Sequence, residues 1–294
     1  MADERGASPS DSPPALSQQG PPPMQLGLRV RYGVARWLFG LGYGLLGFRR
    51  ATIRDNLARS FPGADARALR AMRREFIARQ SEVFAEIDYA RKMSADELRT
   101  RVRLVNPQAL TNAQAPRPAI FAGAHQCNFE WLLLRASLEL GEGLLALYKP
   151  LSNERAERYF RTVRTRFGTR LVPAKSVLRE LARFREARGI GLVADQVPRS
   201  SPEKHWLEFL HQPTAFYMGP ELLGRALRST VYYVSMRRVA RGQYDIEFVP
   251  LNEPGEKAPS GSITERYARA LERDVQADPA GWWWSHRRWK LSKK

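Results

Sequence analysis

Phe121-Ala122-Gly123-Ala124-His125-Gln126-Cys127-Asn128-Phe129-Glu130-Trp131 is the stretch of sequence that decides the fold. A short apolar run ends near Gly123 and a helical pattern begins at Asn128, so the stretch predicts a buried strand that passes directly into a helix. Such passages build α/β sheets, in which ligands bind at the carboxyl ends of the strands. A histidine followed five positions later by a carboxylate at this point indicates a candidate active site.

The same alternation of short apolar runs and helical patterns continues to the end of the chain. We expect strands at residues 119–122, 144–148, 190–194, 230–236 and 245–250, and helices at residues 128–139, 153–167, 176–187, 216–227 and 263–277. The prediction is an α/β fold in which helices flank a mixed central sheet.

A different texture precedes the sheet. Residues 51–100 repeat apolar side chains at steps of three and four, which predicts helices. We therefore divide the chain into a helical, membrane-interfacial subdomain at residues 24–100 and an α/β core at residues 101–294. Residues 1–23 are rich in Pro, Ser, Gln and Gly, carry no signal-peptide pattern, and are expected to form a disordered tail.

Residues 32–48 are the segment most similar to a membrane span. They are short of the ~20 residues that a spanning helix needs, and they contain Arg36 and the closely spaced Gly40, Gly42, Gly44 and Gly47. Aromatic side chains beside flanking arginines are typical of a helix that lies in the headgroup layer. The alternative is a glycine-rich helix packed on the protein's own core.

The chain is strongly basic, with 48 Lys and Arg against 30 Asp and Glu and a formal net charge of +18. This charge predicts attraction to a polyanion, which could be nucleic acid, an anionic membrane surface or an acidic carrier protein. No nucleic-acid-binding motif is visible, so we expect no nucleic-acid partner. The single cysteine, Cys127, excludes an intramolecular disulfide and a zinc cluster.

His125 and Glu130 can be interpreted as a proton-transfer pair. If Glu130 folded back to accept a hydrogen bond from one imidazole nitrogen, the other nitrogen would be free to act as a base. No Gly-x-Ser-x-Gly elbow is present, so the attacking hydroxyl would belong to the substrate. On spacing alone, a buried structural histidine capped by a helix is the better explanation of the pattern.

Four ordered blocks extend the pattern beyond this pair. They are Arg54-Asp55-Asn56-Leu57-Ala58-Arg59-Ser60-Phe61-Pro62, Tyr148-Lys149-Pro150, Val193-Ala194-Asp195-Gln196 and Trp284-Ser285-His286-Arg287-Arg288-Trp289-Lys290. Together with His-x4-Glu they resemble the late acyltransferase family of lipid A biosynthesis, the lauroyl and myristoyl transferases of lipopolysaccharide assembly.

The resemblance implies transfer of an acyl chain from acyl carrier protein to a hydroxyl of a glycolipid such as a lipid A precursor, at the cytoplasmic face of a bacterial inner membrane. It also implies that His125 is the general base and Glu130 its orienting partner. We expect no metal and no cofactor, since a thioester needs only a positioned hydroxyl, a base and oxyanion donors. Relatives of the family acylate other lipids, glycosides or polyene pigments, and these acceptors remain open.

Cationic side chains are the candidates for binding the phosphates of both substrates. Lys149, Arg164, Arg166 and Arg199 are expected on strand ends, a helix or a loop of the catalytic sheet. Arg164 and Arg166 lie in the region where the resembled family has a functional arginine. A separation of two residues turns them about 200° apart on a helix, so we expect one of them to face the site. Asp195 could act in the site or pair with Arg199.

Two other features allow two readings each. Cys127 could accept an acyl group, or it could be a packing residue at the start of the helix. Residues 282–284, three consecutive tryptophans, could pack in the core or anchor the protein at a membrane interface.

Overall fold

A seven-stranded mixed sheet forms the centre of the protein, and its strands are arranged in the order β1-β9-β8-β2-β5-β3-β4. The computed structural model describes residues 25–111, 117–198 and 204–291, so the expected tail at residues 1–23 lies outside the described residues. Neighbouring strands run parallel except for β8 and β9, which pair antiparallel. The strands of this sheet are β1 (Val102–Leu104), β2 (Ala119–Gly123), β3 (Leu144–Tyr148), β4 (Arg170–Pro173), β5 (Gly189–Val193), β8 (Val231–Ala240) and β9 (Gln243–Pro250). An antiparallel hairpin, β6 (Lys204–Phe209) and β7 (Gln212–Tyr217), stands apart from it.

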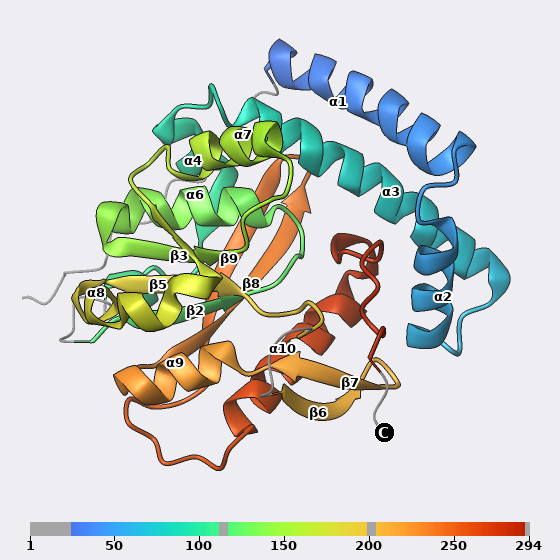
Figure 1. The fold of residues 1–294 in the computed structure, drawn as a ribbon. Coiled ribbons are helices and arrows are strands. Elements are labelled where there is room, and N and C mark those ends of the chain that lie inside the picture. The colour runs from blue at the N-terminus through green and yellow to red at the C-terminus, as the bar shows by residue number, and fades with distance from the viewer. Residues whose placement is uncertain (1–24, 112–116, 199–203, 292–294) are drawn as a thin grey trace, which may run out of the picture.

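Helices cover both faces of the sheet (Figure 1). The α-helices are α1 (Leu26–Phe39), α2 (Arg50–Ser60), α3 (Ala66–Tyr89), α4 (Ala95–Arg101), α5 (Gln108–Thr111), α6 (Phe129–Leu140), α7 (Glu154–Arg164), α8 (Leu181–Glu186), α9 (Gly219–Leu227) and α10 (Ser262–Ala277). A π-helical turn, η1 (Gly40–Leu45), continues α1, and η3 (Gly141–Gly143), η4 (Ala174–Glu180) and η5 (Pro279–Gly281) are short 3₁₀ segments.

The alternation of side chains along β2 divides the core into two clusters. Ile120 and Ala122 face one cluster, to which α8, α9, α10 and the hairpin contribute, whereas Ala119 and Phe121 face the other, which contains residues of α1, α3, α4, α6 and α7. Every residue of β2 is buried, as expected for a central strand of a sheet that is covered on both sides.

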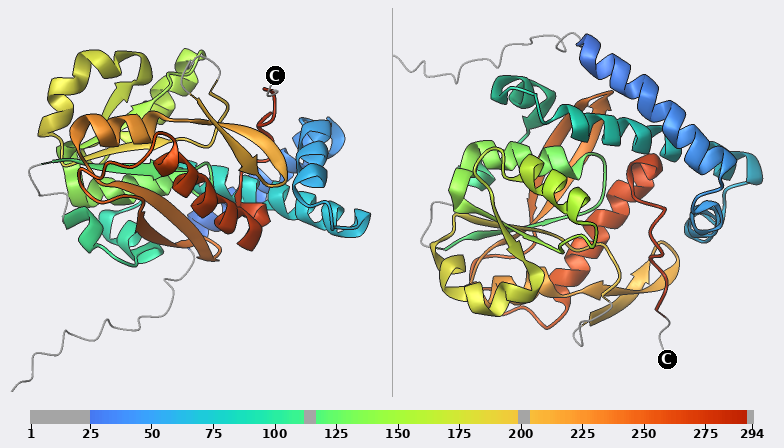
Figure 2. Two further views of the ribbon diagram at one scale, coloured as in Figure 1. Left: turned by 90° about the horizontal axis from the view of Figure 1, so that it is seen from below. Right: turned by 45° about the horizontal axis from the view of Figure 1, so that its top comes forward.

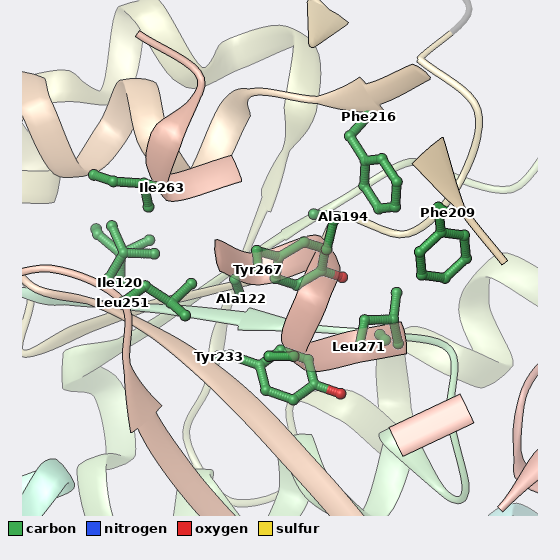
Figure 3. Packing of buried hydrophobic residues seen from close by; sticks show 14 of the residues in the cluster. Ile120, Ala122, Ala194, Phe209, Phe216, Tyr233, Leu251, Ile263, Tyr267 and Leu271 are labelled. Atoms are coloured by element: carbon green, nitrogen blue, oxygen red, sulfur yellow. The ribbon is translucent and has the colours of Figure 1, made fainter. Parts of the chain in front are cut away.

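Helix α10 fixes the end of β2. Its residues Ile263, Tyr267 and Leu271 pack over the sheet beside Ala122 and Ala194 (Figure 3). The hydroxyl of Tyr267 donates a hydrogen bond of 2.8 Å to the carbonyl of Gly123, the last residue of β2. The strand end that precedes His125 is therefore held by a buried side chain from the far end of the sequence.

Helix α1 lies along the outside of α3 (Figures 1 and 2). Below it, the carboxylate of Glu86 on α3 is fully buried and accepts hydrogen bonds from Tyr32, Tyr244 and Asn128 at 2.7, 2.7 and 2.8 Å. Burial raises the pKa of Glu86, although these three donors oppose the rise. One carboxylate thus joins α1, α3, β9 and the residue that caps α6.

The predicted α/β class is confirmed, and the expected strand at residues 144–148 coincides with β3. The expected helix at residues 216–227 was placed too early, because Phe216 belongs to β7 and α9 begins at Gly219. The hairpin β6-β7 and the edge strand β4 were not predicted. The expected helix at residues 176–187 begins as the 3₁₀ segment η4, and the expected helix at residues 153–167 ends at Arg164.

Replacing Glu86 by Ala should destabilise the fold by about 3 kcal/mol or more, because three buried donors lose their acceptor at once. Glu75 on the same helix is a matched control, since it is exposed and pairs with Arg79 alone among the described ion pairs. Glu75→Ala should cost less than about 1 kcal/mol. Urea unfolding of the two variants measures both values, and equal costs would contradict the role given to Glu86.

Candidate active site

His125 and Asp195 follow two strands that are paired in register. β2 and β5 run parallel with Gly123 opposite Val193, so each of the two residues lies two positions beyond a paired strand end. The imidazole Nδ1 of His125 is 2.7 Å from Oδ1 of Asp195. The backbone N–H of His125 also donates to Oδ2 of the same carboxylate, at 3.1 Å. The register of the sheet therefore brings base and acid together.

Asp195 is buried, and its neighbours stabilise the ionised form of its carboxylate. The indole N–H of Trp282 donates to Oδ2 at 2.9 Å, and the guanidinium of Arg288 lies near enough to interact with the carboxylate. Burial alone would raise the pKa of Asp195, but the interactions with His125 and Trp282 lower it to about 2. The carboxylate is therefore ionised at neutral pH.

The protonation of the imidazole follows from this contact. An ionised carboxylate can only accept hydrogen bonds, so in the neutral imidazole the proton resides on Nδ1 and the lone pair on Nε2. The amide nitrogen of Gln196 lies 3.2 Å from Nε2 and donates to it. His125 is partly exposed, so Nε2 can exchange this amide for a substrate hydroxyl.

The predicted hydrogen bond between His125 and Glu130 is wrong. Glu130 is buried, and its carboxylate accepts a fork of hydrogen bonds from Arg164 on α7, at 2.5 Å from Nη2 and 2.9 Å from Nε. The carboxylate that contacts the imidazole is Asp195 instead.

The backbone between the two residues explains why Glu130 does not fold back. Gln126 forms a β-bridge with Trp282, and the N–H of Cys127 donates to the carbonyl of Gly281 at 2.9 Å. Cys127 adopts a left-handed φ of 50°, after which Asn128 caps α6. The segment is thus held along the C-terminal chain, and α6 directs Glu130 toward α7.

The other predicted substrate-binding residues are not gathered in one place. Arg166 donates to the main-chain carbonyls of Ala90 and Met93, so it secures the segment after α3. Lys149 is exposed just beyond the carboxyl end of β3, at the same edge of the sheet as His125. Arg199 lies outside the described residues, and so does its proposed pairing with Asp195.

Cys127 is a packing residue in this structure. Its side chain is buried beside Gly281, Tyr244 and Arg238, and burial raises the pKa of the thiol to about 12. Because the nucleophile in thiol chemistry is the thiolate, this environment disfavours acyl transfer through Cys127.

The C-terminal segment at residues 282–291 closes the site. Trp282 and Trp284 are buried in the core, whereas Trp283 is half-buried with its ring 5.5 Å from that of His125. Asn56 on α2 donates to the carbonyls of Trp284 and His286 at 2.8 and 2.9 Å. The contact of Trp282 with Asp195 was not foreseen, and its one sequence signal is the run of three tryptophans.

No group of three or more His, Cys, Asp or Glu in the described ranges is arranged to hold a metal ion. The site offers an imidazole base with a partly exposed nitrogen and an ionised carboxylate beside it, and this pair is suited to removing a proton from a hydroxyl.

Comparison with protein families finds a match over residues 23–291 to the family described as bacterial lipid A biosynthesis acyltransferase. The match includes every described residue named in this site. Comparison with curated proteins finds no match.

Neutralising Asp195 and neutralising Glu130 should have different effects on acyl transfer. Asp195→Asn should lower kcat on the order of a thousandfold or more, because the charge that orients His125 and stabilises its imidazolium is lost. Glu130→Gln should act mainly on stability, by about 3 kcal/mol, because it leaves Arg164 buried without its counter-charge. Steady-state kinetics and unfolding of both variants provide the test. Full activity in folded Asp195→Asn protein, with none in folded Glu130→Gln protein, would return the orienting role to Glu130.

Proposed function

We propose, since the chain belongs to the bacterial lipid A biosynthesis acyltransferase family, that it moves a fatty acyl chain from an acyl carrier protein thioester to a hydroxyl of a glycolipid such as a lipid A precursor. The observation that supports this reaction is the hydrogen bond of 2.7 Å between His125 and the ionised Asp195, at the carboxyl edge of the sheet. The family membership establishes acyl transfer in lipid A biosynthesis as the class of reaction.

The proposed step begins with the acceptor hydroxyl at Nε2 of His125. Nε2 takes the hydroxyl proton while the oxygen attacks the thioester carbonyl, and the resulting oxyanion then collapses to break the C–S bond. The proton on Nε2 passes to the departing thiol, so a new ester forms and the imidazole is restored. Asp195 contributes most where the imidazolium carries charge, which is in the transition state.

Glu130 takes a different part in this proposal from the one expected. Its ion pair with Arg164 joins α6 to α7. Glu130 lies in the first turn of α6, where the helix dipole also stabilises a negative charge. We propose that the pair fixes the position of the helix that follows His125. Lys149, exposed at the same edge of the sheet, and the net charge of +18 suit the phosphates and the acidic carrier.

The outer surface of α1 and η1 supports attachment to the inner membrane, at its cytoplasmic face. Leu45 and Leu46 are 78% and 74% exposed, and the side chain of Trp37 is exposed as well. Arg36, Arg49 and Arg50, which the sequence places among these residues, suit anionic headgroups. Among the described helices, none has the length and apolar character that crossing a bilayer requires. We propose a peripheral contact through the exposed apolar and cationic side chains of residues 36–50.

The reaction can be tested with purified enzyme, an acyl carrier protein thioester and a lipid A precursor, with the product identified by mass spectrometry. His125→Ala should lower transfer by about 10²- to 10⁴-fold, because the base is lost. Cys127→Ser is the control and should retain most of the activity. An acyl group trapped on Cys127 would contradict the direct mechanism, and acylation of a different lipid, glycoside or pigment would change the acceptor.

Membrane attachment predicts a specific loss. Replacing Leu45 and Leu46 by Ser should weaken binding to anionic vesicles about tenfold or more, because two exposed leucines no longer enter the hydrocarbon. High salt should weaken the binding of the unaltered protein as well. In the matched control, Ser replaces Leu151 and Leu222, which are exposed elsewhere on the molecule. Vesicle sedimentation measures the binding of both double variants. Equal losses of binding in the two would contradict a docking surface on α1 and η1.

A further inference from the structure

A continuous row of aromatic rings connects His125 to the exposed surface of η1. Phe129 and Trp283 flank the imidazole, with ring centroids 4.8 and 5.5 Å from it. These two rings are 5.5 Å from each other, so they form one wall beside the base. Both side chains are half-buried.

The row continues away from the site along α3 and α1. Trp283 is followed by Phe84 at 6.3 Å, and Phe84 by Phe39 at 5.1 Å. Tyr43 then lies 5.5 Å from Phe39, and Phe48 lies 5.3 Å from Tyr43. We call these six residues the aromatic row: Phe129, Trp283, Phe84, Phe39, Tyr43 and Phe48.

The aromatic row comes from parts of the chain that are far apart in sequence. Its members belong to α6, the C-terminal segment, α3, α1, η1 and the residues just before α2. α1 and α3 lie side by side in each view of the molecule (Figures 1 and 2). Every member is partly or largely exposed, in contrast to Trp282 and Trp284, which are fully enclosed in the core. Packing α1 on α3 does not by itself require rings that remain open to solvent.

We propose that the aromatic row binds a hydrocarbon chain of the lipid acceptor and guides it from the bilayer to His125. This proposal rests on the proposed function. Aromatic rings offer a large apolar surface that binds an aliphatic chain without specifying its conformation. The acceptor is already embedded in the membrane, and the outer end of the row, at Phe48, closely follows the exposed Leu45 and Leu46 along the chain.

Charge at the outer end of the row favours the acceptor over the acyl donor. The guanidinium of Arg49 lies 5.8 Å from the ring of Phe48, and Arg50 follows it. A carrier protein delivers its acyl chain from solution, whereas a phosphate-bearing lipid presents its headgroup and its chains together at the membrane surface. Arginines next to apolar rings suit both parts of such a lipid.

The test uses the full chain in mixed detergent micelles, where attachment to vesicles does not limit the rate. Acyl transfer is measured with an acceptor that has chains of natural length and with a soluble analogue whose chains are short, and the ratio of the two kcat/KM values is compared between variants. Phe84→Ser should lower this ratio about tenfold, because the long chain loses a ring on its route. Phe84→Leu, which keeps an apolar side chain there, should restore most of it.

Leu222→Ser on α9 is the matched control, because Leu222 is 39% exposed and Phe84 is 37% exposed. Its ratio should equal that of the unaltered protein. Phe39→Ser provides a second variant and should behave as Phe84→Ser does. An unchanged ratio in both folded row variants would overturn the proposal. A ratio that depended on the length of the donor chain instead would assign the row to the donor. Failure of the unaltered protein to acylate either acceptor would refute the proposed function itself.

Discussion

The in-register pairing of β2 with β5 is the constraint on which the site depends. Gly189 begins β5 opposite Ala119, and a Cβ atom there would lie 2.6 Å from the ring of Phe121. The glycine therefore lets the two strands keep this register beside a large aromatic side chain. A shift by one residue would turn each side chain of β5 to the other face of the sheet, and the residues after the strand would turn with it. Asp195 would then no longer lie beside His125.

The C-terminal segment supplies the second constraint. Trp282 contacts the carboxylate of Asp195, and the neighbouring backbone pairs with Gln126 and Cys127. Asn56 holds the same segment from the other side through two carbonyl groups. The blocks of sequence around residues 56, 125, 195 and 284 are therefore parts of one structure, although more than 200 residues separate the first from the last.

The sequence was sufficient to predict the central strands and to place His125 and Asp195 each at a strand end. It was not sufficient to show which strands are neighbours, since strand order depends on packing between distant segments. For that reason the sequence points to Glu130, the carboxylate nearest along the chain, as the partner of His125. Arg164 and Arg166 illustrate the same limit: Arg164 ends α7 and pairs with Glu130 on α6, whereas Arg166 lies beyond that helix and binds carbonyls of the chain after α3.

Three buried carboxylates hold the stretch from His125 to Trp131, and their partners explain their different roles. Asp195 binds an imidazole that can gain and lose a proton, so its fixed negative charge can stabilise the positive charge that forms on His125 during a reaction. Glu130 binds the permanently charged Arg164, which gives a fixed ion pair.

Glu86 accepts from Asn128 and two tyrosines, while its backbone carbonyl accepts from the indole of Trp131 at 3.0 Å. These neutral donors fix the position of the loop, but none of them is a base that could take a proton from a substrate. Of the three carboxylates, Asp195 is thus the one whose partner suits acid-base chemistry. The other two hold the segment that carries this partner, His125, in one position.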